Sequence, residues 1–158
     1  METKWVVMVV LVLAGLALWG LPKTAFARKL RMTVGLFYGI NIVGILVGIA
    51  GLALTFSRPD LVLEEHYYEL LLLPVFLSYI YFALLQVVQR SKEILDEKQT
   101  LNMTQAAAAT FPYSVFWVFI LYALYREAVL TGLVFFPLFV FFVLLAYSVN
   151  VLLFYKRD

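Results

Sequence analysis

Five long apolar runs, separated by short polar segments, divide the chain. They cover residues 5–21, 34–56, 70–88, 106–124 and 133–155. An α-helix rises about 1.5 Å per residue, so about 20 apolar residues cross a hydrocarbon layer of roughly 30 Å. The runs are apolar on all sides and do not alternate in polarity, which favours helices over the strands of a membrane barrel. The pattern predicts an all-α integral membrane bundle of about five transmembrane helices, folded as a single domain over residues 1–158.

The first run admits two interpretations. Trp5 and Trp19 bracket it at the positions of interfacial aromatic belts. The segment from Thr24 to Ala27 that follows is similar to the small-residue cleavage site of a secretory signal peptide. A signal peptide begins with a basic region, whereas this chain begins with only one lysine and one glutamate before the run. We therefore interpret residues 5–21 as the first transmembrane span.

The second run, residues 34–56, contains no charged residue and is rich in glycine. Its glycines are Gly35, Gly39, Gly44, Gly48 and Gly51. At about 100° per residue, the last three share one helix face with Asn41 at its edge, and the first two fall on nearly the opposite face. Helices in lipid associate through close backbone approach and occasional polar contacts. We expect these six residues to pack against neighbouring helices on both sides, and Asn41, Gly44 and Gly48 to contact a helix of a partner protein.

The distribution of charge predicts an orientation. Nine of the twelve lysines and arginines fall in the segments that would lie on one side of the membrane: Lys23, Arg28, Lys29, Arg31, Arg90, Lys92, Lys98, Lys156 and Arg157. Cytoplasmic segments of membrane proteins carry an excess of such residues. The bias predicts that the N-terminus lies outside and the C-terminus inside.

Composition removes several classes of function. The chain is 65% hydrophobic with a mean hydropathy of +0.96, which excludes a soluble core. A net charge of +2 does not suggest a nucleic-acid partner. Cysteine is absent, which excludes thiolate catalysis and cysteine-ligated clusters. We expect no cofactor, and partners limited to membrane lipids and either another membrane protein or further copies of the chain.

Two groups of polar residues are candidate sites. Glu65, His66 and Glu69 lie within one helical turn and could bind a metal ion, although an acidic turn at a helix N-terminus explains them more simply. Ser78 and Gln86, together with Asn41, could line a polar path through the membrane. They could equally join helices through hydrogen bonds. The five runs contain no Asp, Glu, Lys, Arg or His, which argues against an ion-coupled pump.

One short region resembles a known class of proteins. It comprises Asp96-Glu97-Lys98-Gln99, the alanines from Ala106 to Ala109 and the apolar run from Tyr113 to Tyr125. It is similar to uncharacterised small prokaryotic multi-pass membrane proteins in which an Asp-Glu-Arg or Asp-Glu-Lys motif lies between two helical hairpins. The resemblance implies a prokaryotic cytoplasmic membrane and no known activity.

These observations lead to three functional hypotheses. The first is a non-enzymatic accessory or scaffold subunit of a larger membrane protein complex. Residues that favour close helix packing are plentiful in the chain, whereas potentially reactive side chains are few. The second is a small homo-oligomeric transporter or channel with Asn41, Ser78 and Gln86 on its path. The third is a membrane enzyme that acts on a lipid through Glu65, His66 and Glu69. The sequence favours a protein that is not an enzyme.

Overall fold

The computed structural model describes residues 33–63, 67–89 and 97–156. It also describes nine positions nearer the N-terminus: Met8, Val9, Val12, Leu13, Gly15, Leu16, Trp19, Gly20 and Thr24. The side chains of Glu69 and of residues 82–89, 97–99 and 156 are outside this description. The described residues form helices joined by short turns, without a strand among them. The predicted all-α class is therefore confirmed.

Helix α2 (Val34–Ser57) spans 24 residues and has a defined cap at each end. Thr33 adopts an extended backbone, and its Oγ1 accepts a hydrogen bond of 3.2 Å from the Leu36 amide, which satisfies one free N–H of the first turn. At the other end, the Arg58 amide donates to the Leu54 carbonyl at 2.8 Å. Pro59 follows Arg58 and disfavours a helical backbone at the residue before it.

The short helix α3 (Pro59–Leu63) follows α2 at one end of the bundle. There the Arg58 guanidinium lies 2.9 Å from a carboxylate oxygen of Asp60, and both side chains are exposed. The hydrogen bond from Arg58 lowers the pKa of the Asp60 carboxyl below its ordinary value. The same hydrogen bond, together with the charge of Asp60, raises the pKa of Arg58. Because water screens exposed ion pairs, this pair orders the turn more than it stabilises the fold.

Helix α4 (Tyr67–Gln89) contains Pro74 in its second turn. Proline lacks an N–H and so cannot donate to the carbonyl one turn before it. One turn later, the Ser78 hydroxyl donates to the Pro74 carbonyl at 2.7 Å, an acceptor within its own helix.

Helices α5 (Glu97–Arg126) and α6 (Gly132–Lys156) form a hairpin. Ala128, in the turn between them, has a positive φ of 58°. The Ala128 amide donates to the Tyr125 carbonyl and the Val129 amide to the Leu124 carbonyl, both at 3.0 Å. A left-handed residue just after a helix, with such bonds back to the last turn, is a common helix end where glycine is preferred.

Replacing Ala128 with glycine should stabilise the protein, because a Cβ in the left-handed region costs about 1–2 kcal/mol. The added flexibility of glycine in the unfolded chain offsets part of this gain, so we expect a net increase of about 0.5–1 kcal/mol. The measurement is the free energy of unfolding in mixed micelles. The matched control is Ala108→Gly in the exposed face of α5, where glycine should destabilise by about 1 kcal/mol. Equal effects at the two positions would contradict the argument.

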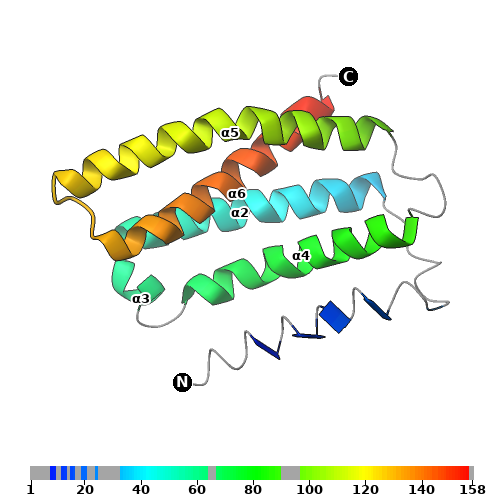
Figure 1. Ribbon diagram of the computed structural model, residues 1–158, viewed down its shortest axis with the longest axis horizontal. Helices are drawn as coiled ribbons and strands as arrows, with labels where there is room; N and C mark the ends of the chain where they lie inside the picture. The colour runs from blue at the N-terminus through cyan, green and yellow to red at the C-terminus, as the bar shows by residue number, and fades with distance from the viewer. Residues whose placement is uncertain are drawn as a thin grey trace.

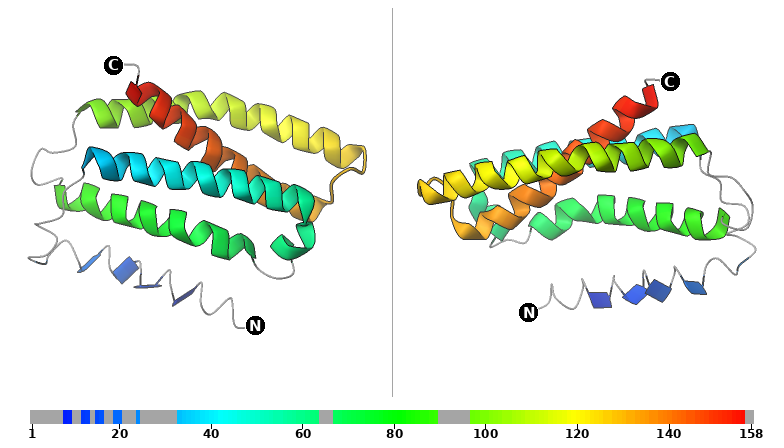
Figure 2. Two further views of the ribbon diagram at one scale, coloured as in Figure 1. Left: turned by 180° about the vertical axis from the view of Figure 1, so that it is seen from behind. Right: turned by 45° about the horizontal axis from the view of Figure 1, so that its top comes forward.

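The helices are arranged around α6. Figure 1 shows α6 crossing between α5 and α2, with α4 on the far side of α2. The most extensive contacts join α2 to α6 and α5 to α6, and α4 contacts α2 less extensively. The left view in Figure 2 shows that α5 and α4 lie on opposite sides of the pair formed by α2 and α6. Helix α6 therefore provides most of the packing surface of the bundle.

Three clusters of buried apolar residues lie along α6. One, at Phe141 and Leu144, gathers Val47 of α2 and Val75 of α4. A second joins Val151 to Phe37 of α2 and Ala106 of α5, near the end of the bundle where α6 terminates. A third joins Val134, Leu138 and Leu121 near the α5–α6 turn. In all three, side chains of α6 fill the space between its neighbours.

Three described helices are long and apolar enough to cross a membrane: Val34–Ser57, Thr100–Arg126 and Gly132–Tyr155. The protein is accordingly an integral membrane protein. The expected count of five spans is not confirmed, because the run at residues 5–21 lies mostly outside the described residues. In α4, the described apolar stretch Leu70–Tyr81 is shorter than a span.

The boundaries of one predicted element differ from the structure. The sequence predicts that the polar segment at residues 89–105 continues the helix of residues 70–88 or forms a helical corner. Instead, residues 97–105 form the first turns of α5, which is 30 residues long. Good helix formers without glycine or proline favour a helix in this segment, but they do not determine to which neighbour it belongs. Asp96, in the motif that resembles the prokaryotic class, lies outside the described residues.

Candidate functional site: the α2–α6 contact and a small cavity

The glycine face of α2 packs against α6 of the same chain. A Cβ placed on Gly48 would lie 2.7 Å from the Leu145 Cβ and 3.0 Å from the Phe141 carbonyl oxygen. A Cβ on Gly44 would overlap the Ser148 Oγ and lie 3.2 Å from the Ser148 Cβ. Only glycine leaves room for this approach, which brings the two backbones into near contact. The neighbour of this face is therefore an internal helix.

The same contact continues one turn further along α2. A Cβ on Gly51 would overlap the ring of Phe141, which is completely buried. Thr55, also buried, donates its hydroxyl to the Gly51 carbonyl at 2.6 Å, so its polar group is satisfied within α2. The Phe141 ring thus occupies the space that a side chain at residue 51 would need.

Gly35 and Gly39, on the opposite face of α2, have a different environment. A Cβ on either would meet no described atom within 4 Å. The two glycine faces predicted from the sequence are therefore not equivalent in the structure. One is in close contact with α6, and the glycines of the other have no described atom within reach of a Cβ.

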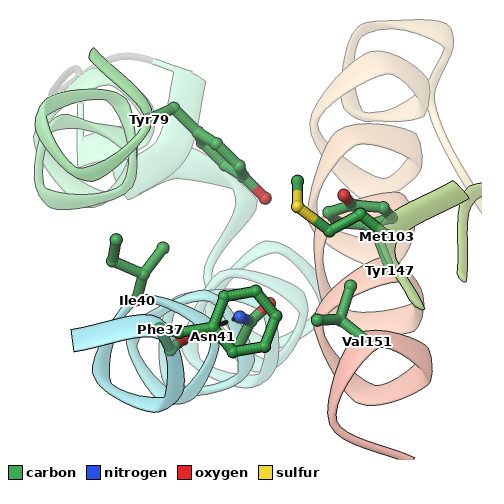
Figure 3. Close-up of a pocket in the computed structure, with 7 residues that line it drawn as sticks. All are labelled: Phe37, Ile40, Asn41, Tyr79, Met103, Tyr147 and Val151. Atoms are coloured by element: carbon green, nitrogen blue, oxygen red, sulfur yellow. Dashed lines mark hydrogen bonds between the residues drawn. The ribbon is translucent and has the colours of Figure 1, made fainter. Parts of the chain in front are cut away.

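A small cavity lies where α2, α4, α5 and α6 meet. Its volume is about 10 Å³, and its lining residues are Phe37, Ile40, Asn41, Tyr79, Met103, Tyr147 and Val151. Figure 3 shows the Tyr79 hydroxyl pointing from α4 across the cavity toward Met103 and Tyr147. Each of the four helices contributes at least one side chain, so the cavity exists only in the assembled bundle.

The polar groups around the cavity are incompletely paired. The Asn41 Nδ2 donates to the Phe37 carbonyl at 2.8 Å. Among the described residues, Ser148 Oγ on α6 and Asn102 Nδ2 on α5 are buried and have no hydrogen-bond partner. A buried polar group left unpaired destabilises a structure by about 1–3 kcal/mol.

Two hydrogen bonds join α5 to α6 outside the cavity. The Asn150 Nδ2 donates to Thr110 Oγ1 at 3.0 Å, and the Trp117 Nε1 donates to the Leu138 carbonyl at 3.3 Å. The indole of Trp117 also stacks on Phe142, with ring centroids 4.5 Å apart. These contacts show how uncharged polar residues in apolar runs serve helix packing.

The expected polar path of Asn41, Ser78 and Gln86 is brought together only in part. Asn41 lines the cavity. Ser78 does not, and its hydroxyl is bonded within α4. The side chain of Gln86 lies outside the described residues. The tyrosines at 79 and 147 were not among the predicted site residues, although a phenol in the middle of an apolar run is a signal that could have indicated them.

The acidic segment cannot be placed. Glu65, His66 and the side chain of Glu69 lie outside the described residues. Within the described part of the chain, no group of three or more His, Cys, Asp or Glu side chains could hold a metal ion.

Comparisons with known proteins gave no relative: no protein-family model, curated protein or solved structure matched the chain.

Proposed function

We propose that this chain is a non-enzymatic accessory or scaffold subunit of a larger membrane protein complex. The observation that carries the proposal is the one-sided packing of α5. In the most apolar stretch of α5, 11% of residues are buried inside the protein, against 33% in α2. Among the described helices α5 has extensive contacts only with α6. A long apolar helix with one neighbour presents most of its surface to lipid or to another protein.

The chemistry of the exposed α5 surface favours a protein partner. We define this surface, the aromatic face, by five exposed side chains: Phe111, Phe116, Phe119, Tyr122 and Tyr125. Rigid aromatic side chains bury large areas at a small loss of conformational entropy, which suits them to interfaces.

Tyr113 adds a polar argument. It lies at the midpoint of the candidate span Thr100–Arg126, is 56% exposed, and has no hydrogen bond to a described residue. A hydroxyl in hydrocarbon without a partner is unfavourable by at least about 1 kcal/mol. A neighbouring membrane protein that supplies an acceptor would remove this penalty, whereas lipid tails cannot.

The proposal extends to the membrane topology of the chain and to Gly35 and Gly39. Five spans, with residues 5–21 and 70–88 as the first and third, place nine of the twelve basic residues on the inner side. This arrangement has the N-terminus outside and the C-terminus inside a prokaryotic cytoplasmic membrane. Gly35 and Gly39 are then available to a partner helix near the inner end of α2.

The test is gentle solubilisation of native membranes, purification of the tagged chain, and measurement of particle mass and composition. We expect a second membrane protein in stoichiometric amount. In the double variant Phe116→Ala, Phe119→Ala, the partner should dissociate at least about tenfold more readily, which corresponds to 1.4 kcal/mol.

The matched control is Leu46→Ala, an exposed side chain on α2 outside the aromatic face. It should leave the complex intact. Both sets of substitutions remove exposed side chains, so both proteins should fold. A particle that contains only copies of this chain would overturn the proposal, as would a partner retained equally by both variants.

A second function, a small homo-oligomeric transporter or channel, is favoured by one observation. The cavity places Asn41, Tyr79 and Tyr147 together inside an apolar bundle. Solute flux through purified protein in liposomes would support this function if Asn41→Leu abolished it. Liposomes that remain tight would exclude it.

A further inference from the structure

We propose that helix α5 is hinged at Pro112 and that its N-terminal half, residues 97–111, is a flap that opens and closes over the cavity. The flap is closed in this structure, where it contributes to the cavity wall. The hinge does not depend on the accessory-subunit function, because the motion takes place within a single copy of the chain. It follows from the backbone at Pro112, from the different packing of the two halves of α5 and from an unpaired amide in the flap.

The backbone of α5 lacks a regular hydrogen bond near its midpoint. Pro112 lies near the middle of the 30 residues of the helix and has no N–H to donate to the Ala108 carbonyl. On either side of that carbonyl, the Thr110 hydroxyl donates to the Ala106 carbonyl at 2.7 Å, and the Ser114 hydroxyl donates to the Thr110 carbonyl at 2.9 Å. Proline and such hydroxyl bonds to the preceding turn are common causes of helix bends. Figure 1 shows α5 bending near its middle.

The C-terminal half of α5, residues 113–126, is firmly attached to α6. Leu121 is completely buried and packs with Leu138. Trp117 donates its indole N–H to the Leu138 carbonyl at 3.3 Å and stacks on the ring of Phe142. Helices in lipid associate through close packing and hydrogen bonds, and this half of α5 has both.

The flap is attached less firmly. Its buried side chains in the described part of the chain are Asn102, Ala106 and Thr110, which lie four residues apart and form one stripe. Two of these are polar, and Ala106 contributes a single methyl group to the cluster that contains Val151. A hydrogen bond from Asn150 Nδ2 to Thr110 Oγ1 joins the flap to α6. The flap therefore has fewer stabilising contacts than the C-terminal half.

The closed position also leaves one amide of the flap unpaired. Asn102 is 1% exposed, and its Nδ2 has no hydrogen-bond partner among the described residues. A buried donor without an acceptor destabilises the conformation that buries it. Asn102 lies within the first two turns of α5, near the polar end of the helix, so an outward movement of the flap exposes this amide to water. The contacts of Ala106 and Thr110 favour the closed position, and the unpaired amide opposes it.

Motion of the flap changes the cavity. Met103 is the residue of α5 that lines the cavity, and the other lining residues belong to α2, α4 and α6. Among the described helices, α5 has extensive contacts only with α6, so no other described helix blocks an outward movement. Opening the flap removes the wall that Met103 forms and connects the cavity with the surroundings of the bundle.

The sequence contains no cysteine, which makes a distance measurement straightforward. Pairs of introduced cysteines carry spin labels, and double electron–electron resonance gives the distribution of distances between them in the full chain in bilayers. Leu101 and Ala123 are both exposed and lie at equal separations in sequence from Pro112, one in each half of α5. Each is paired with Leu46, an exposed residue of α2.

We expect two peaks for the pair at residues 101 and 46, the longer distance arising from the open flap, and one peak for the pair at residues 123 and 46. Pro112→Ala restores the missing N–H and should remove the longer peak. The matched control is Pro74→Ala, which replaces another exposed proline within a helix and should leave both peaks in place.

Two further variants test the balance between the positions of the flap. Asn102→Leu removes the unpaired donor and should reduce the longer peak several-fold. Thr110→Val removes the acceptor of the bond from Asn150 and should increase it several-fold. Opposite changes would contradict the roles assigned to these two side chains.

Three results would overturn the hinge at Pro112. A single peak for the pair at residues 101 and 46, unchanged by Pro112→Ala, would mean that α5 has only a fixed bend. Two peaks for both pairs would mean that α5 moves as one body. Loss of the longer peak in both proline variants would place the origin of the motion outside Pro112.

Discussion

Gly48→Ala should separate α2 from α6 and destabilise the protein by about 1–3 kcal/mol, the usual effect of overpacking. The added Cβ would lie 2.7 Å from the Leu145 Cβ and 3.0 Å from the Phe141 carbonyl oxygen. Backbone atoms of α6 cannot move aside as a flexible side chain can, so the helices must shift as units. Gly48→Leu should have a larger effect because it adds three further carbons at the closest approach. The measurement is the free energy of unfolding during denaturation in mixed micelles.

Gly39→Ala is the matched control for this substitution. It makes the same chemical change in the same helix, but at a position where a Cβ meets no described atom within 4 Å. We expect no loss of stability, since alanine also has the higher helix propensity. If alanine were equally harmful at 39 and 48, close packing against α6 would not be the reason for glycine at position 48.

Phe141→Ala should destabilise the protein by about 3–5 kcal/mol, the range for removal of a buried phenylalanine ring. The Phe141 side chain is completely buried and packs with Val47 and Val75. Its ring also meets Tyr68 edge to face, with centroids 5.6 Å apart. Loss of the ring leaves a cavity between α2, α4 and α6 that surrounding helices fill only in part.

The control for Phe141→Ala is Phe119→Ala on α5, where the ring is 67% exposed. This change should alter the free energy of unfolding by no more than about 0.5 kcal/mol. Both variants lose the same atoms from an apolar helix. A similar loss of stability in the two would mean that removal of the ring itself, and not its burial, determines the effect.

The effects of substitutions at Gly51 and Phe141 on the free energy of unfolding should be coupled. Gly51→Ala places a Cβ in the space of the Phe141 ring, so it should destabilise the wild-type protein. In the Phe141→Ala background the ring is gone, and the same substitution should be neutral or mildly favourable. The expected coupling energy is about 0.5–3 kcal/mol. Additive effects would show that residues 51 and 141 do not compete for the same space.

Part of the architecture could be predicted from the chain alone. The periodicity of residues 34–56 separated the glycines into two faces, and the structure shows that Gly44, Gly48 and Gly51 do share one contact surface. Periodicity succeeds there because a uniform helix fixes the direction of every side chain. It could not identify the neighbour. Any sufficiently flat helix surface can receive three glycines, and here the chain supplies that surface itself in α6.

The residues that line the cavity were harder to predict from the sequence. Asn41 was a candidate because a carboxamide is unusual in an apolar run, whereas Tyr79 and Tyr147 were not among the predicted site residues. Tyrosine side chains occur at lipid interfaces, in packed cores and beside polar cavities, so the residue type alone does not distinguish these environments. Only the meeting of four helices makes Tyr79, Tyr147 and Asn41 line the same cavity.

The all-α integral membrane class follows from the sequence, because the length and apolar character of a run decide whether a helix can cross a bilayer. The sequence also determined which faces of α2 can approach a neighbour closely. The tertiary structure adds that α6 occupies one of those faces, that no described residue packs closely on Gly35 or Gly39, and that α5 begins at Glu97. The physical reason is that helix formation is local, whereas the choice of neighbour depends on the complementarity of surfaces far apart in the chain.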